Sequence, residues 1–159
     1  MLDRPLLGTP QIVRVGPQLA AVIRLTLPRH QLRQVMGPAF AELQAEASVQ
    51  GLTLGPAFTR PLRPPGDVVE LEAGFEVDRP IRPVGRVRRG ELPAATVVRS
   101  VYRGPYEGLA AAWAELRTWI AHQGLVAGAD HWERYLTGAE SGSEPAAWRT
   151  ELNREIVIR

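Results

Sequence analysis

The sequence contains no cysteine and no lysine. Without cysteine, disulfide bonds, thiolate catalysis and cysteine-based zinc sites are excluded. Without lysine, Schiff-base chemistry is excluded, and so is a P-loop with its phosphate-binding lysine. Serine is sparse, and no serine lies in the G-x-S-x-G turn of serine hydrolases. A Ser-His-Asp triad is therefore not expected.

Long apolar runs are also missing. No stretch approaches the roughly 18 apolar residues of a membrane helix. The start of the chain, Met1 to Pro5, lacks the basic and apolar segments of a secretory signal. We therefore expect a cytoplasmic protein. The three histidines do not have the spacing of metal ligands, so neither a metal nor a cofactor is expected.

Charge of one sign is not in large excess, because the formal net charge of the 159 residues is +2. The densest basic run, from Arg82 to Arg89, is interrupted by proline and glycine and contains no aromatic residue. It is predicted as part of a solvated linker, and direct nucleic-acid binding is not expected. With 45% hydrophobic and 23% charged residues, the composition is that of a globular domain.

The chain repeats itself. Residues Phe40–Leu43 (FAEL) return as Trp113–Leu116 (WAEL), and Gln50–Leu52 (QGL) returns at the same spacing as Gln123–Leu125 (QGL). Later matches follow in the same order after an insertion in the second copy. Colinear matches favour a duplicated unit over chance. The predicted copies are residues 10–78 and 93–159, joined by a linker at residues 79–92, within one domain of residues 1–159.

Each copy carries one predicted helix. Apolar residues of the second copy recur at helical spacing, as do their first-copy counterparts: Leu109, Trp113, Leu116 and Ile120, then Met36, Phe40, Leu43 and Ala47. Gly51 and Gly124 stand where left-handed C-caps are expected. Pro38 predicts either a helix start near Gly37 or a looser turn before it. Pro105 suits a first helical turn.

Flanking segments are predicted as strands: Gln11 to Val15, Leu19 to Thr26, Val69 to Val77, Pro93 to Val101 and Arg149 to Ile158. The alternation of Glu70, Glu72 and Glu76 with apolar residues predicts a strand with one solvated face. The predicted fold class is α+β, with two β-α-β-β units related by a pseudo-two-fold axis. The sheet should be mostly antiparallel, with both helices on one side and a groove between the copies as the concave site.

The segment Val101–Leu109 (VYRGPYEGL) resembles the opening of the second helix in the GyrI-like small-molecule-binding (effector-binding) family. The segments that follow it resemble the family in order and spacing: Trp113–Trp119, Gln123–Leu125, Trp132–Tyr135 and Trp148–Leu152. The resemblance covers the whole chain, more strongly from Val97 onward. No single motif is diagnostic, but their order is fairly specific.

The resemblance implies two SHS2-like β-α-β-β modules and an aromatic-lined pocket. It also implies an acidic residue in the second copy that faces cationic aromatic ligands. Family members include bacterial multidrug-sensing domains of transcription regulators, stand-alone proteins, hydrolases that open reactive cyclopropanes, and a protein inhibitor of DNA gyrase. Because the two copies account for the whole sequence, we expect a stand-alone member without a helix-turn-helix.

Glu133 is the leading candidate for a ligand-binding residue. On a strand it shares one face with Tyr135, while Trp132 and Arg134 take the other. A carboxylate beside an aromatic ring suits a cationic ligand. The alternative is a solvated strand glutamate paired with an arginine. The match to the family position favours the ligand-binding interpretation.

Aromatic residues supply the other candidates. Tyr102 and Tyr106 flank the predicted junction between strand and helix, where either ring could stack on a ligand or donate from its hydroxyl. Tyr106 could equally pack at the helix start. Trp113, Trp148 and the repeat partner Phe40 could line the pocket, although core packing explains Trp113 and Phe40 as well.

Three functions remain open from the sequence. The first is a module that binds hydrophobic, often cationic aromatic small molecules as a sensor or sequestering protein. The second is a cyclopropane-opening hydrolase in which Glu133 acts on water and a tyrosine, such as Tyr106, assists. The third is a protein inhibitor of the gyrase type. Predicted edge strands leave homodimerisation through a sheet edge open.

Overall fold

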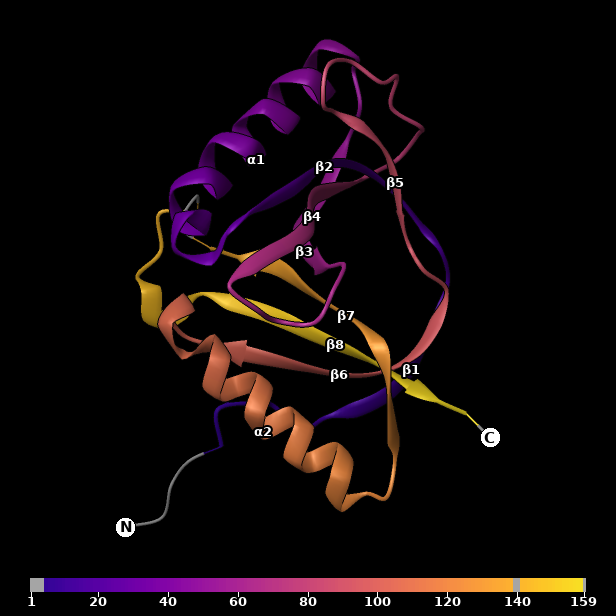
Figure 1. The fold of residues 1–159 in the computed structure, drawn as a ribbon, viewed down its shortest axis with the longest axis vertical. Helices are drawn as coiled ribbons and strands as arrows, with labels where there is room; N and C mark the ends of the chain where they lie inside the picture. Colours follow the sequence, from indigo (N-terminus) through magenta and orange to yellow (C-terminus); the bar gives the residue numbers. More distant parts are fainter. Residues whose placement is uncertain (1–4, 139–140, 159) are drawn as a thin grey trace. The chain divides into compact units, whose positions relative to one another are not determined.

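A computed structural model describes residues 5–138 and 141–158. The described residues form eight antiparallel strands and two α-helices, which confirms the predicted α+β class (Figure 1). In chain order these are β1 (Gln11–Val15), β2 (Gln18–Pro28), α1 (Leu32–Val49), β3 (Leu54–Pro61), β4 (Val68–Val77), β5 (Arg88–Leu92), β6 (Ala95–Arg103), α2 (Leu109–His122), β7 (Val126–Thr137) and β8 (Arg149–Val157). Single 3-10 turns precede α1, α2 and β8: η1 (Arg29–Gln31), η2 (Tyr106–Gly108) and η4 (Pro145–Ala147).

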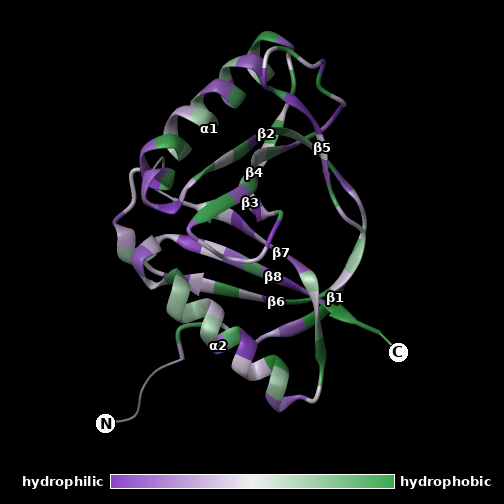
Figure 2. Cartoon of the chain, in the orientation of Figure 1, coloured by the Kyte–Doolittle hydropathy of each residue, from purple (hydrophilic) through white to green (hydrophobic). Residues whose placement is uncertain are grey.

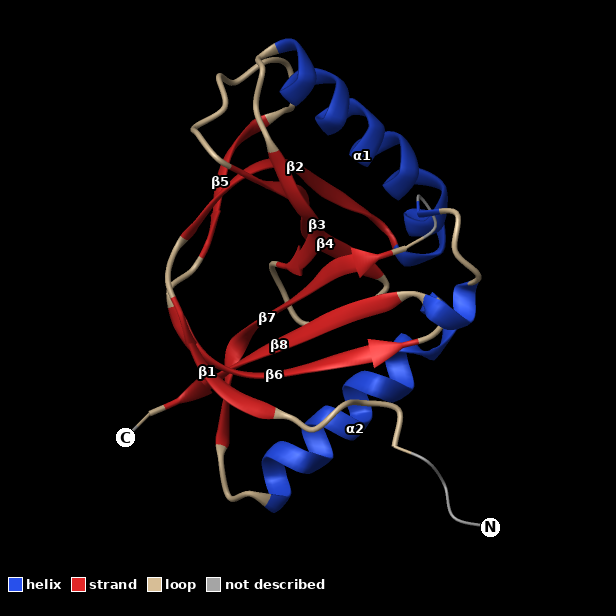
Figure 3. Ribbon diagram, turned by 180° about the vertical axis from the view of Figure 1, so that it is seen from behind, coloured by secondary structure: helices blue, strands red, loops and turns tan. Residues whose placement is uncertain are grey.

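One compact unit combines β1 with the chain from residue 95 onward. Its strands are ordered β1-β6-β8-β7, and α2 packs on one face of them (Figure 3). The core on that face contains Leu7 and residues of β6, α2 and β8: Val98, Tyr102, Ala112, Leu116, Ile120, Leu152 and Ile156. The helical face predicted for the second copy is thereby confirmed, because Leu116 and Ile120 are buried while Leu109 and Trp113 pack against the core.

The other compact unit comprises residues 16–94. Its strands are ordered β3-β4-β2-β5, and α1 contacts β2, β3 and β4. Apolar and polar residues alternate along α1, as they do along α2 (Figure 2). The predicted stripe of α1 is confirmed, since Leu43 and Ala47 are buried and Met36 and Phe40 pack against the same core.

The segment predicted as a linker is more ordered than its composition indicates. Its second half contains β5, which pairs with β2 as an edge strand. Ile81 and Val87 are buried in the core of this unit, and the Arg89 guanidinium donates to the Ile81 carbonyl at 2.8 Å. The prediction that the whole stretch is solvated is therefore wrong. Scattered apolar residues among arginines, prolines and glycines gave too weak a pattern to show it.

Both helices begin elsewhere than expected. The helix α1 begins at Leu32 and carries Pro38 inside it, so the prediction of a start near Gly37 is wrong. Pro38 is exposed, which leaves the backbone carbonyl that loses its partner near solvent. Pro105 precedes η2 instead of lying in the first turn of α2. Both predicted C-caps are confirmed, with φ of 69° at Gly51 and 70° at Gly124.

The glutamates of β4 do not form a solvated face. Glu70 pairs with Arg24 at 3.0 Å, and Glu72 pairs with Arg60 at 3.4 Å. Glu76 is only 9% exposed. The prediction of a wet face is wrong, since Glu70 and Glu72 are half-buried and paired with arginines and Glu76 is buried.

Candidate functional site

The carboxylate of Glu133, on β7, accepts one hydrogen bond at each oxygen. The Trp113 indole Nε1 donates to Oε1 at 2.6 Å, and the Tyr135 hydroxyl donates to Oε2 at 2.7 Å. Both donors are neutral. Across the described ranges no arginine pairs with Glu133. These contacts do not fit the alternative of a solvated strand glutamate paired with an arginine.

The environment of Glu133 disfavours its charge. Burial raises the pKa of the carboxyl above its ordinary value of 4.5, and the hydrogen bonds from Trp113 and Tyr135 oppose this shift without overcoming it. The residue as a whole is half-buried. We infer that the carboxylate is the covered part, because Trp113 and Tyr135 enclose it. An ionised carboxylate placed in this way lacks a counter-charge, and a bound cation would supply one.

Strand register places Glu133 beneath α2. Glu133 lies opposite Leu152 of β8, which belongs to the core covered by α2. Residues directly opposite on antiparallel strands point to the same face, so Glu133 points toward the helix. Tyr135 follows on this face with the period of two that a strand imposes. Trp113 reaches Glu133 from the apolar stripe of α2.

Two aromatic residues, Trp113 and Tyr135, contact this carboxylate, and Tyr106 and Trp148 continue the contacts from Tyr135. We call these four residues the aromatic cluster. The Tyr106 ring lies edge-on to Tyr135, with centroids 5.8 Å apart, and tilted against Trp148 at 4.7 Å. The Trp148 indole Nε1 donates to the Ser143 carbonyl at 3.1 Å, which fixes that ring. Of the predicted candidates, Glu133 and these four residues are linked by direct contacts.

Tyr102 is placed apart from the aromatic cluster. It is 4% exposed, packs in the core under α2, and donates its hydroxyl to the Pro105 carbonyl at 2.7 Å. Gly104 and Gly108 leave room for it, since a Cβ at Gly108 would overlap the Tyr102 hydroxyl. These contacts give Tyr102 a supporting position, in which it braces the turn that carries Tyr106.

Phe40 lies in the other unit, where its ring meets Phe75 edge-on with centroids 5.6 Å apart. The first copy also lacks a counterpart of the carboxylate. In the predicted repeat, Glu70-Leu71 matches Glu151-Leu152, and the residue across from Leu71 on β3 is Pro61. Glu133 occupies that place in the second copy. The acidic site is therefore a feature of the second copy alone.

His131 lies beside the aromatic cluster, and it was not among the site residues predicted from the sequence. It is half-buried on β7 with its ring edge-on to Trp113, at a centroid distance of 5.3 Å. Burial lowers its pKa, and the nearby Arg154 acts in the same direction. The period of two that places Glu133 and Tyr135 together also places His131 on their face. That signal was present in the sequence.

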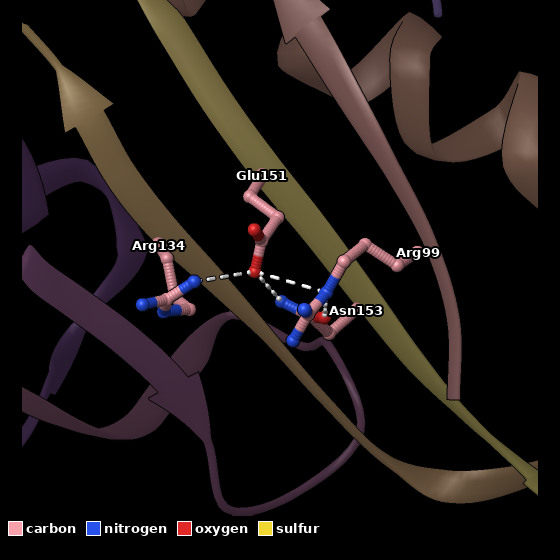
Figure 4. A network of polar contacts seen from close by, with 4 residues as sticks. All are labelled: Arg99, Arg134, Glu151 and Asn153. Carbon is pink, nitrogen blue, oxygen red and sulfur yellow. Dashed lines mark hydrogen bonds and ion pairs between the residues drawn. The ribbon is translucent and has the colours of Figure 1, made fainter. Parts of the chain in front are cut away.

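The opposite face of the same strands carries a polar network (Figure 4). The Glu151 Oε1 atom accepts from Arg134 at 2.9 Å, from Asn153 at 3.1 Å and from Arg99 at 3.2 Å. Arg99 also donates to the Asn153 side-chain oxygen at 2.8 Å. Glu151 is 6% exposed and Asn153 is fully buried. The network joins β6, β7 and β8, and so braces the strands that carry Glu133.

No group of three or more histidine, aspartate or glutamate side chains in the described part of the chain could hold a metal ion. Among the described helices, none has the length and apolar character needed to cross a membrane.

Comparison with known proteins identifies a family. The model of the GyrI-like small molecule binding domain matches residues 8–153. No curated protein matches the chain. The C-terminal domain of EcmrR, a solved structure, has a TM-score of 0.83 at 20% identity, over 97% of this chain and 99% of that domain.

EcmrR in its complex with DNA gives a TM-score of 0.81 at 21% identity, over 95% of this chain and 57% of the EcmrR chain. The present chain thus spans little more than half of that protein. A hydrolase from Listeria innocua gives a TM-score of 0.64 at 13% identity, over 93% of this chain and 91% of the hydrolase. SAV2435 bound to tetraphenylphosphonium gives a TM-score of 0.63 at 12% identity, over 94% of each chain. These likenesses show a shared fold, and together with the family match they lead to one conclusion: the chain belongs to the GyrI-like small molecule binding domain family.

Proposed function

We propose that this chain binds hydrophobic, often cationic aromatic small molecules at the aromatic cluster beside Glu133, as a sensor or sequestering domain. One observation carries the proposal: a covered carboxylate is held by two neutral donors, Trp113 and Tyr135, and no arginine pairs with it in the residues described. Retaining an uncompensated carboxylate costs free energy, so a function in binding charge is its simplest explanation.

The surrounding rings fit the same ligand class. An aromatic face attracts a cation, and the attraction grows when water is excluded. Tyr106 is 37% exposed, so one ring of the aromatic cluster is accessible from solvent. A flat or propeller-shaped aromatic cation could stack on such a ring while its charge approaches Glu133. The likeness to SAV2435 bound to tetraphenylphosphonium supports this class of ligand.

Hydrolysis is the second candidate, and the raised pKa of Glu133 favours it. A carboxyl whose pKa lies above its ordinary range is a stronger base once ionised, as a residue that deprotonates water requires. The Tyr135 hydroxyl, at 2.7 Å from Glu133, would then hold the water or donate to the leaving oxygen. The likeness to a hydrolase of the same fold supports keeping this candidate.

Titration of tryptophan fluorescence with tetraphenylphosphonium tests the binding proposal. We expect saturable quenching, because Trp113 and Trp148 both belong to the aromatic cluster. Absence of saturable quenching in both wild type and a Trp119→Phe control, which removes an indole outside the cluster, would contradict it. For the hydrolase, an activated cyclopropane compound is incubated with the protein and recovered by chromatography. Consumption that Glu133→Gln abolishes would favour the enzyme, and full recovery would favour the binding module.

A further inference from the structure

Thr150 is a buried polar residue next to the aromatic cluster that the proposed function leaves unused. It lies on β8, directly opposite Tyr135 on β7 and Tyr102 on β6. Directly opposite residues of antiparallel strands share a face, with Cβ atoms about 5 Å apart. The Thr150 side chain therefore points to the face of α2 and lies between the two tyrosines. Trp148 precedes it by two residues of extended backbone.

The hydroxyl of Thr150 has no partner. The residue is fully buried, and within the described ranges its Oγ1 atom makes no hydrogen bond. The neighbouring hydroxyls are already engaged, since Tyr102 donates to the Pro105 carbonyl and Tyr135 donates to Glu133. A buried hydroxyl without a partner destabilises a folded protein, and most buried polar atoms avoid this state.

Packing does not explain why threonine stands at this position. Valine has nearly the same shape, favours strands equally well and would leave no polar atom unsatisfied. The hydroxyl faces the side of the sheet that carries Glu133 and Tyr135, so its missing partner is on the same side as the proposed ligand. It can both donate and accept a hydrogen bond.

We propose that the Thr150 hydroxyl contacts the ligand and makes the site selective for aromatic cations that also carry a hydroxyl, ether or carbonyl oxygen. This inference rests on the proposed binding function. Because Thr150 is fully buried in the free protein, a ligand reaches it only when a neighbouring side chain moves aside.

A matched pair of probes tests the inference. Tetraphenylphosphonium has no hydrogen-bonding group, whereas (hydroxyphenyl)triphenylphosphonium, as its meta and para isomers, adds one hydroxyl. For the wild type we expect at least one isomer to gain about 5-fold in affinity over the parent cation, the worth of one hydrogen bond. Thr150→Val should abolish this preference and change the affinity for the parent by less than about 2-fold, while Thr150→Ser should retain the preference.

The outcomes separate the two proposals. If the parent cation binds and both isomers show the same relative affinity in wild type and Thr150→Val, the Thr150 inference is overturned and the binding function stands. If none of the phosphonium cations binds, the binding function fails and the inference falls with it. Thermal unfolding of the free protein gives an independent readout. Thr150→Val should raise the melting temperature by about 2 °C or more, since it removes an unsatisfied hydroxyl. A lower melting temperature would show that the hydroxyl is satisfied without ligand and would overturn the inference.

Discussion

Trp113 of α2 and Glu133 of β7 are joined by a hydrogen bond of 2.6 Å between the indole Nε1 and the carboxylate Oε1. The bond ties the helix to the strand beneath it and fixes the orientation of the carboxylate. The same tryptophan belongs to the apolar stripe that packs against the core. One side chain thus serves both packing and the proposed site, which is why its sequence position alone left the two interpretations open.

Removal of the indole donor should raise the pKa of Glu133 further. In Trp113→Phe the burial that disfavours the charge remains, while one hydrogen bond that favours it is lost. We expect the free energy of unfolding to fall by about 2 kcal/mol as well, from the loss of a hydrogen bond to a charged group. Carboxyl ¹³C chemical shifts followed through a pH titration measure the pKa directly.

Trp119→Phe provides the matched control for this experiment. Trp119 lies on the same helix and packs against the same core, outside the aromatic cluster. Its replacement should leave the titration of Glu133 unchanged. Equal titration of Glu133 in the wild type and in Trp113→Phe would show that the indole does not set the electrostatics of the carboxylate.

The raised pKa of Glu133 predicts a definite pH dependence of stability. Because the folded protein holds this proton more tightly than the unfolded chain, folding takes up a proton above pH 4.5, the ordinary pKa of the group. The contribution of Glu133 to stability should therefore fall as pH rises from 4.5 to the native pKa, and stay constant above it.

Urea unfolding of wild type and Glu133→Gln across this pH range isolates the effect. Glutamine keeps an acceptor for Trp113, presents an N–H2 donor to the Tyr135 hydroxyl oxygen, and does not titrate. Glu70 and Asp78 have lowered pKa values, so their contributions are lost only as pH falls below their ordinary pKa values of 4.5 and 3.8, and they cancel in the comparison. The free energy of unfolding of the wild type minus that of Glu133→Gln should fall as pH rises. If this difference rises with pH, or does not vary, the assignment of a raised pKa to Glu133 is contradicted.

Much of the fold follows from sequence patterns. The period of two on β7 placed Glu133 with Tyr135 and apart from Arg134, and the helical period gave the stripe of α2 that includes Trp113. Both are local rules, and the structure follows them. The predicted duplication rests on matching residues that keep their order. The carboxylate that distinguishes the second copy stands opposite Leu152, where the first copy has Pro61.

Other features depend on distant parts of the chain. The strand β5 is defined by its pairing with β2, and Ile81 is buried by residues far away in sequence, so neither shows a local pattern. Tyr102 lies at the junction between strand and helix, where the sequence predicted a ligand contact, but its hydroxyl donates to the Pro105 carbonyl. The missing partner of Thr150 becomes visible only when every neighbouring polar atom is placed.

The polar network of Glu151 should contribute more to stability than an exposed ion pair. Glu151→Ala would leave Arg99 and Arg134 facing a buried gap, and we expect a loss of about 3 kcal/mol. Glu42→Ala is the matched control, because Glu42 pairs with Arg86 at the surface at 3.0 Å. Its loss should lie between about 0 and 1 kcal/mol. Similar urea midpoints for the two variants would mean that the network does not brace the strands.

The central claim is that Glu133 recognises positive charge, and the charge selectivity of binding tests it most directly. Calorimetry would compare tetraphenylphosphonium with neutral triphenylphosphine oxide, at a pH above the native pKa of Glu133. Glu107→Gln, at an exposed glutamate beside Tyr106, serves as the control for general surface charge. We predict that Glu133→Gln weakens binding of the cation about 10-fold or more, as expected for loss of a charged partner, while the neutral compound and the control variant change by less than about 2-fold. Equal weakening of both compounds, or none, would contradict a role for Glu133 in recognising charge.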